Sequence, residues 1–168
     1  MELFTENLML RPVDITDIDE VARVKKNEKG GTISLEEARE AIEEMQNNHT
    51  KNKPGYIYNL CFAVFEKGKN KIIGWCGFDG RLYNRFDIFY SIDPMYRNRG
   101  YATQCAKKLL SYAFDEVRLP YVHGGCDKNN TAAFKIMSKI GMVQNAFVPE
   151  TGDPLFFIDE AMYRALVI

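Results

Sequence analysis

The residues from Arg97 to Thr103 combine the side chains and the spacing that bind a phosphate group. Arg97 and Arg99 carry guanidinium forks, which match the geometry of phosphate oxygens. Gly100 lets the backbone come close to an anion, and a helical pattern begins directly after it. The first N–H groups of a helix have no partner within the helix and carry partial positive charge. The segment therefore predicts a site for a phosphate or a pyrophosphate.

The same turn excludes two common nucleotide-binding loops. No Lys-Ser or Lys-Thr pair follows Gly100, as a Walker A loop requires. The triple-glycine fingerprint of dinucleotide-binding folds is also absent. A basic loop with a glycine turn is the alternative interpretation, because a lone glycine near arginines also arises by chance. The interpretation of this turn as a phosphate site therefore needs support from motifs elsewhere in the chain.

The overall composition limits the class of protein. The chain has 168 residues, which suits one compact domain. A net charge of -1 argues against broad binding to nucleic acid or to an anionic membrane. The four cysteines lack the paired spacing of zinc or redox sites, so we expect no metal. Reduced thiols and an N-terminus without a signal-peptide pattern favour a cytoplasmic protein.

Hydrophobic periodicity predicts a mixed α/β fold in one domain. Apolar runs and alternating patterns predict strands over residues 8–13, 56–66, 71–78, 86–92, 121–126, 143–148 and 156–167. Helical spacing predicts helices over residues 14–26, 34–48, 102–116 and 131–140. Ser34 and Glu37 have the spacing of a capping box at the start of the second helix.

Four ordered segments together resemble the GNAT superfamily of N-acetyltransferases. Arg97, Gly100 and Ala102 are spaced as in the acyl-CoA motif of that family, and residues 87–94 resemble the strand that precedes it. Residues 130–133 and 139–142 resemble its second motif, which begins with Asn130. Residues 5–12 resemble the opening of the branch that acetylates ribosomal-protein N-termini, and residues 159–165 resemble the closing strand.

The resemblance implies a fold and a co-substrate. The fold would be a mostly antiparallel, twisted sheet of six or seven strands, split in a V and flanked by about four helices. A single N-acetyltransferase domain would cover residues 1–168, with its core over 7–168. Acetyl-CoA would place its pantetheine arm in the split and its pyrophosphate on the turn. The binding residues would be Ser91, Ile92, Arg97, Asn98, Arg99, Gly100, Tyr101, Ala102, Thr103 and Asn130. Asn130 can also cap the helix over 131–140, and the two roles are compatible.

The resemblance also suggests a base but no acid. Asp87 stands where many members carry an acidic residue that removes a proton, and alternation directs it away from the face of Tyr90. A solvated carboxylate is the alternative, and Asp79 is a second candidate base. Met137 and Ala133 occupy the positions where members carry a Tyr or Ser acid. A backbone N–H near Ile92 would polarise the thioester carbonyl. The thiol, of pKa about 8.5, can leave as thiolate and take its proton from water.

The acceptor is expected to be a primary amine of low pKa. An α-amino group of pKa about 7.7 is roughly one-sixth neutral at pH 7, whereas a lysine of pKa about 10.4 is neutral about four times in ten thousand. A site with no recognised acid therefore favours a peptide N-terminus or a small amine. The helix over 34–48 and the loop over 79–85 would border this site, with aromatic residues as core or as walls: Trp75, Phe78, Tyr83 and Phe86.

Three further expectations complete the interpretation. The alternative to an enzyme is a catalytically degenerate module that binds acyl-CoA and regulates or senses another process. The sequence is compatible with a monomer or a homodimer. His49 and His123 lack ligand spacing, so we interpret both as structural or surface residues.

Overall fold

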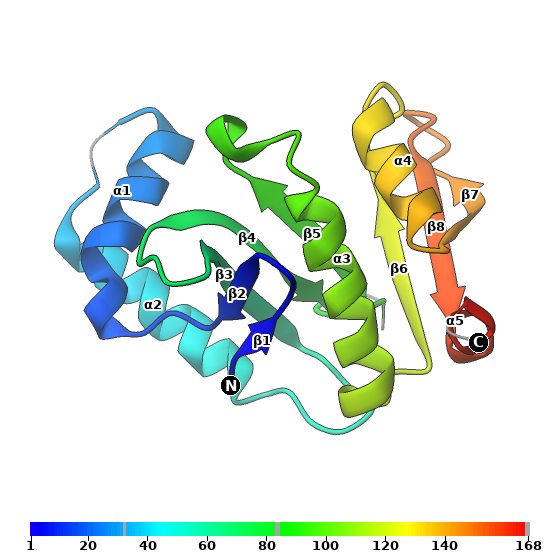
Figure 1. Cartoon of the computed structure of the whole chain (residues 1–168), viewed down its shortest axis with the longest axis horizontal. Coiled ribbons are helices and arrows are strands. Elements are labelled where there is room, and N and C mark those ends of the chain that lie inside the picture. Colours follow the sequence, from blue (N-terminus) through cyan, green and yellow to red (C-terminus); the bar gives the residue numbers. More distant parts are fainter. Residues whose placement is uncertain (32, 83–84, 167–168) are drawn as a thin grey trace.

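The computed structural model describes residues 1–31, 33–82 and 85–166, and its centre is a sheet of eight strands (Figure 1). The strands follow the order β1-β2-β3-β4-β5-β6-β8-β7 across the sheet. Their bounds are β1 Leu3–Phe4, β2 Leu8–Arg11, β3 Asn59–Glu66, β4 Ile72–Asp79, β5 Asp87–Ile92, β6 Tyr121–Gly125, β7 Val143–Phe147 and β8 Pro154–Asp159. The predicted mixed α/β class is confirmed, and the sheet has one strand more than the largest number expected.

β5 and β6 join the two parts of the sheet at a single bridge. All other neighbouring strands in the described sheet run antiparallel, whereas β5 and β6 run parallel and pair only at Asp87 and His123. At this bridge the His123 N–H donates to the Phe86 carbonyl over 2.9 Å. Figure 1 shows the two strands diverging from this point. The split sheet expected from the family resemblance is therefore present.

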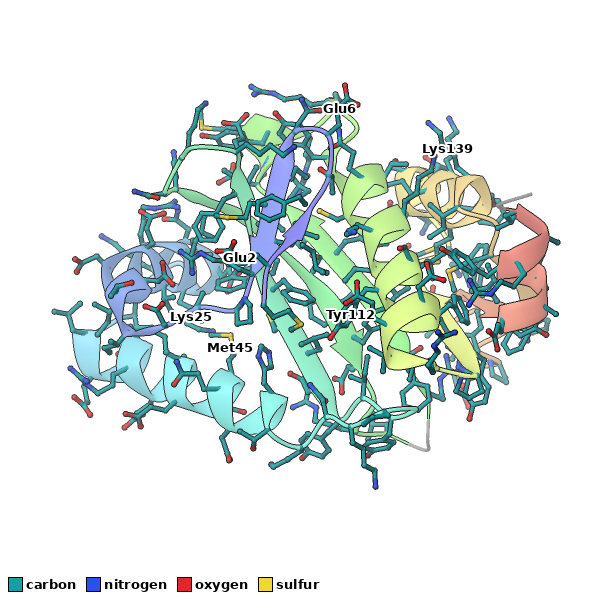
Figure 2. All side chains as sticks on the ribbon, turned by 60° about the horizontal axis from the view of Figure 1, so that its bottom comes forward. Glu2, Glu6, Lys25, Met45, Tyr112 and Lys139 are labelled. Carbon is teal, nitrogen blue, oxygen red and sulfur yellow. The ribbon has the colours of Figure 1, made fainter. Side chains whose placement is uncertain are left out.

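Five α-helices flank the described sheet, one more than the four predicted. They are α1 Ile18–Lys29, α2 Leu35–His49, α3 Tyr101–Ser111, α4 Thr131–Lys139 and α5 Glu160–Leu166. α1 and α2 pack together at one end of the molecule, where Figure 2 labels Lys25 and Met45. None of the helices in the described part of the chain combines the length and hydrophobicity that a bilayer span needs.

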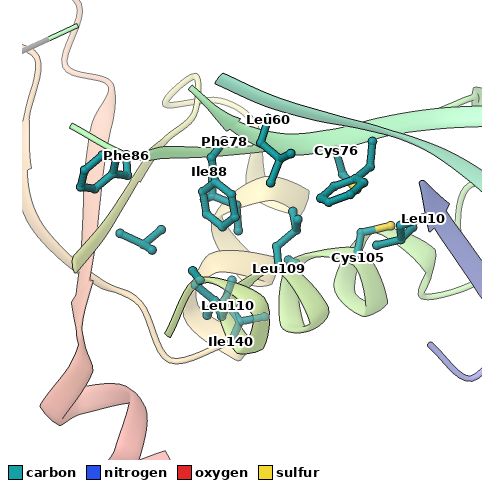
Figure 3. Packing of buried hydrophobic residues seen from close by; sticks show 14 of the residues in the cluster. Leu10, Leu60, Cys76, Phe78, Phe86, Ile88, Cys105, Leu109, Leu110 and Ile140 are labelled. Atoms are coloured by element: carbon teal, nitrogen blue, oxygen red, sulfur yellow. The ribbon is translucent and has the colours of Figure 1, made fainter. Parts of the chain in front are cut away.

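The central strands are covered on both faces, because their side chains alternate between two cores. Phe62 and Val64 of β3 belong to the larger core, which includes the buried face of α3. Figure 3 shows Leu109 of α3 close to the strand residues of this core. Ala63 and Phe65 point the other way, into a smaller core with α1 and α2. The two faces of β3 therefore look toward different helices.

The capping box at the start of α2 is confirmed. The Ser34 hydroxyl accepts the Glu37 N–H over 3.1 Å, and the Glu37 carboxylate accepts the Ser34 N–H over 2.7 Å. Each side chain satisfies a backbone donor that the helix leaves unpaired. α1 ends three residues later than predicted, where Gly30 adopts the left-handed conformation with φ 65°.

The predicted final strand over 156–167 is wrong beyond Asp159, where α5 begins. The Asp159 carboxylate accepts the Met162 N–H over 2.8 Å, which favours a helical start. Residues 160–166 are mostly strong helix formers, so the helix prevails over the alternation that suggested a strand. Val167, the last residue of that prediction, lies outside the described residues. The two-residue strand β1 was not predicted because two residues give no periodicity.

Candidate functional site

A cavity of about 480 Å³ lies between β5, the following loop, α3 and α4. It occupies the split of the sheet, because its walls come from the free edge of β5 and from α4 beyond it. The structure brings nine of the ten predicted binding residues to this cavity: Ser91, Ile92, Arg97, Asn98, Gly100, Tyr101, Ala102, Thr103 and Asn130. Arg99 is not among its lining residues.

The floor of the cavity is the start of α3. Gly100 precedes the helix with φ 75°, and Asn98 is also left-handed with φ 61°. These two residues turn the chain sharply, so that the first helical N–H groups face outward. Within the described chain, the N–H groups of residues 98–103 have no hydrogen-bond acceptor, and no side chain caps the helix. An anion placed here would meet several unpaired donors and the positive end of the helix dipole.

The two arginines of the turn have different partners. The Arg97 Nε donates to the Ile92 carbonyl over 3.0 Å, which fixes its guanidinium beside the cavity. Arg99 lies over the Tyr96 ring at 5.2 Å and 3.6 Å from the Glu66 carboxylate. The structure therefore holds Arg97 at the cavity and directs Arg99 toward Glu66 on β3.

The side chains of Tyr101 and Asn130, each at the start of a helix, already have partners within the protein. The Tyr101 hydroxyl donates to the Glu66 carboxylate over 2.7 Å, so its side chain is already satisfied. Asn130 accepts the Ala133 N–H over 3.0 Å, which confirms its role as the cap of α4. Asn130 also lines the cavity, so a ligand contact stays a prediction.

The free edge of β5 supplies backbone groups to the split. Along a strand, these groups point alternately to either side. The Asp93 N–H donates to β4, whereas the Phe86 carbonyl accepts from β6. By this alternation the N–H groups of Tyr90 and Ile92 face the split. The carbonyl of Ser91 faces β4, where it would lie 2.2 Å from a Cβ on Gly74. Ser91 therefore offers no backbone hydrogen bond to a ligand in the split.

Met137 and Ala133 stand at the two positions where members of the family carry a proton donor. Met137 is 2% exposed and packs across the split, since a Cβ placed on Gly124 would lie 3.2 Å from its methyl group. Ala133 lines the cavity with a methyl group alone. Neither side chain can donate a proton to a leaving sulfur.

Tyr90 is a polar residue of the cavity that the sequence interpretation missed. It lines the cavity, and its buried hydroxyl has no hydrogen-bond partner among the described residues. Burial, and to a lesser degree the Cys126 thiol, raise the pKa of Tyr90 to about 12. The alternation along β5 placed Tyr90 with the apolar residues, and no sequence signal distinguished it from them.

The opposite face of the sheet carries a row of polar residues in register. Asn59, Asp79, Asp87 and His123 are neighbours on four adjacent strands. Partners across a sheet project to the same face, so the row faces away from α3. Asp87, the predicted base, lies on this row and does not line the large cavity.

Each carboxylate of the row has an arginine partner. Asp87 accepts from Arg85 over 2.8 and 3.2 Å, and Asp79 accepts from Arg81 over 2.7 and 2.8 Å. The Arg81 guanidinium, through this bond, lowers the pKa of Asp79. His123 has a buried Nδ1 without a partner among the described residues. Burial, followed by the charge of Arg85, lowers the pKa of His123, which favours the neutral imidazole.

A second cavity of about 200 Å³ lies on the α1 side of the sheet. It is lined by Arg23 and Glu28 of α1 and by Trp75 of β4. The two cavities share Ser91, Ile92 and Arg97 as lining residues, so they meet at the end of β5. One ligand on each side could therefore approach the same strand from opposite faces.

The predicted borders of an acceptor site are only partly found at this second cavity. Trp75 lines it, whereas Phe78 and Phe86 are buried in the core. Its helical wall comes from α1 rather than from α2. Tyr83 lies outside the described residues.

The sequence of this chain is similar to a family of acetyltransferases and to several of its members. A family model described as an acetyltransferase (GNAT) domain matches residues 7–143. The uncharacterised N-acetyltransferase YnaD of Bacillus subtilis is 24% identical over 154 residues, which cover 88% of this chain and 85% of that protein. YjcK of the same organism, a probable N-acetyltransferase by name, is 21% identical over 151 residues. These cover 81% of this chain and 80% of the length of YjcK.

Solved structures share the fold at low identity. A ribosomal-protein-S5-alanine acetyltransferase from Vibrio fischeri aligns with a TM-score of 0.76 and 15% identity, over 95% of this chain and 97% of its own. RimL, a ribosomal L7/L12 α-N-protein acetyltransferase in complex with coenzyme A, aligns with a TM-score of 0.76 and 17% identity, over 96% and 99%. The family match covers most of the sequence, and the split sheet agrees with it. The chain belongs to the GNAT family of acetyltransferases, which use acetyl-CoA as co-substrate.

Proposed function

We propose that this chain transfers the acetyl group of acetyl-CoA to the α-amino group of a peptide or to a small primary amine. The observation that carries this proposal is the large cavity in the split, beside the free edge of β5. Its floor offers a pyrophosphate helix N–H groups that have no acceptor among the described residues. Asp87 is partly exposed on the other face of β5, where an amine can approach.

Acetyl-CoA would lie in the larger cavity in an extended form. Its pyrophosphate would bind the start of α3 beside Arg97. Its pantetheine amides would pair with the free backbone edge of β5 at Tyr90 and Ile92, as an added strand does. One of these N–H groups would also polarise the thioester carbonyl and stabilise the charge that develops on its oxygen.

The amine would attack from the opposite face, where Asp87 is the proposed base. Its carboxylate is held by Arg85 in the register of His123. The new C–N bond forms as the C–S bond breaks, and the amine proton passes to the Asp87 carboxylate, directly or through water. Because an α-amine is partly neutral at pH 7 and a lysine is not, the α-amine is the proposed acceptor class. The names of the ribosomal-protein acetyltransferases with this fold support the same class.

Two matched peptides test the acceptor class. One peptide has a free N-terminus and an acetylated lysine, and the other has a blocked N-terminus and a free lysine. We expect faster release of CoA thiol from acetyl-CoA at pH 7 with the first peptide. Faster transfer to the lysine would refute the α-amine assignment. Tight binding of acetyl-CoA without turnover on any amine would support a binding module instead.

A double variant tests the pyrophosphate site. Gly100→Glu with Arg97→Ala places a carboxylate at the helix start and removes the neighbouring charge. We expect the Kd for acetyl-CoA to rise on the order of 100-fold or more, since charged hydrogen bonds contribute about 1.5–3 kcal/mol each. Gly55→Glu with Arg39→Ala is the matched control, because Gly55 has the same φ of 75° and lies outside both cavities. Equal affinity of the two double variants would contradict the assignment.

A further inference from the structure

Tyr90 lines the split, where the family's usual proton donor is absent, and its hydroxyl is buried beside the cavity. The strand β5 rises toward the bridge at about 3.3 Å per residue, so Tyr90 lies two residues deeper in the split than Ile92. A pantetheine arm that starts at the α3 turn and follows this edge would bring its sulfur to the deep end. The Tyr90 side chain lines this cavity, and its hydroxyl is buried.

The buried Tyr90 hydroxyl lacks a partner among the described residues, although most buried polar groups in proteins have one. A donor left unpaired in a buried site costs about 1–3 kcal/mol, so its retention points to a ligand. The tyrosine at the cavity floor differs in this respect, because the Tyr101 hydroxyl donates to Glu66. Met137 and Ala133 present only apolar groups across the split.

We infer that the Tyr90 hydroxyl donates a hydrogen bond to the sulfur of CoA as the C–S bond breaks, which makes Tyr90 a catalytic residue of the transfer proposed above. In this step the amine nitrogen bonds to the carbonyl carbon and loses its proton to the base. The electron pair of the C–S bond moves to the sulfur. The thiolate is stabilised by the Tyr90 donor and later takes a proton from water. This inference rests on the proposed function.

The phenol acts as a hydrogen-bond donor and does not give up its proton. Burial raises the pKa of Tyr90 to about 12, above the value of about 8.5 for a free thiol. The Cys126 thiol after β6 acts on this pKa, and the other charged or titratable residues that line the cavity are Tyr96, Arg97, Tyr101 and Lys135. A donor bond to a thiolate in a site of low dielectric constant is stronger than in water. Tyr90 is therefore expected to lower the pKa of the thiol of bound CoA.

The test measures the thiol pKa of CoA bound to wild type and to Tyr90→Phe, through the ultraviolet absorbance of the thiolate. We expect the bound thiol to have a lower pKa than free CoA in the wild type. In Tyr90→Phe we expect it to rise by about one unit, a tenfold change in the ionisation equilibrium. With the amine that the wild type acetylates fastest, kcat should fall about tenfold, with little change in the Kd for acetyl-CoA.

Tyr112→Phe is the matched control. It removes the same hydroxyl from a half-buried tyrosine that donates to the Met1 sulfur and does not line the large cavity. Figure 2 labels Tyr112 where α3 ends and a wider helical turn follows. The bound-thiol pKa and kcat of this variant should equal those of the wild type.

Each outcome distinguishes the inference from the proposed function. If CoA binds both proteins with the same thiol pKa, the inference is overturned and the transferase proposal stands. If CoA does not bind the wild type, both are overturned. Should Tyr90→Phe not fold, a ring-fluorinated tyrosine at position 90 replaces it. This analogue keeps the shape and strengthens the donor, so the bound-thiol pKa must fall further, and an unchanged value overturns the inference.

Discussion

Asp87 and His123 lie opposite each other at the bridge that joins β5 to β6, with both side chains on the face of the sheet away from α3. Arg85 lies beside both, because it forms an ion pair with Asp87 and its charge lowers the pKa of His123. The proposed base therefore belongs to a charged cluster at the narrow end of the split. The electrostatics of this cluster can be tested residue by residue.

Asp87→Asn should lower kcat by about 100-fold or more, because general bases contribute about 10²–10⁴ to the rate. The Kd for acetyl-CoA should not change, since Asp87 does not line the large cavity. Steady-state rates with α-amine peptides and binding titrations measure the two quantities. Asp79→Asn is the control on the neighbouring strand, and its kcat should change less. A larger loss in Asp79→Asn would transfer the role of base to that residue.

Arg85→Gln should raise the pKa of His123. Burial is the largest cause of the lowered value and would remain, but the charge of Arg85 is the second cause, and the Asp87 carboxylate acts in the opposite direction. Removing the guanidinium therefore leaves the favourable effect of Asp87 on the imidazolium without opposition. An NMR titration of the His123 ring nitrogens measures the pKa. A lower value in Arg85→Gln would contradict the arrangement of this cluster.

The stability of the fold should fall below about pH 6.5, partly because of His49. The neutral His49 Nε2 accepts the Cys61 N–H over 3.0 Å, and burial lowers the pKa of His49. Above about pH 6.5 the imidazole is neutral in both states. As the pH falls, the unfolded chain binds a proton that the folded chain resists, so stability falls by at most about 1.4 kcal/mol per pH unit for this group.

Urea unfolding of wild type and His49→Gln at pH 7.5 and pH 5.5 measures the effect. Glutamine can still accept the Cys61 N–H but does not titrate. The wild type should lose more free energy of unfolding between the two pH values than the variant. Equal losses would show that His49 titrates alike in the folded and unfolded states.

Arg97→Lys should raise the Kd for acetyl-CoA about tenfold, whereas Arg99→Lys should have a smaller effect. A lysine cannot both donate to the Ile92 carbonyl and contact a phosphate, as the Arg97 fork can. Arg99 does not line the cavity and is close to Glu66. Calorimetric titration with acetyl-CoA gives both constants. A larger effect at Arg99 would mean that the pyrophosphate lies outside the turn.

Features that depend on local sequence were predicted well. The Ser34 capping box, the glycine turn and the Asn130 cap each require residues only a few positions apart. The fold class and the split sheet followed from motifs whose order and spacing a single sequence displays. Periodicity also placed Asp87 and Tyr90 correctly on opposite faces of β5, because side-chain direction along a strand is a local property.

Features that depend on tertiary contacts could not be predicted. The direction of Arg99 toward Glu66 on β3 joins residues distant in sequence. The Tyr90 hydroxyl lacks a partner among the described residues because of the residues packed around it, which no local pattern reveals. The row from Asn59 to His123 exists only once four strands are in register. The α5 helix was missed because a short pattern allowed both a strand and a helix, and the Asp159 cap decided between them.

A sheet whose two parts share one bridge has a built-in pivot. Any rotation of β6 and its neighbours against β5 about this pivot breaks few backbone bonds, and it moves the far end of the split more than the near end. The α3 turn and the cap of α4 stand at that far end, on opposite sides of it. The gap between β5 and α4 can therefore widen and narrow while Asp87 and His123 at the pivot keep their geometry.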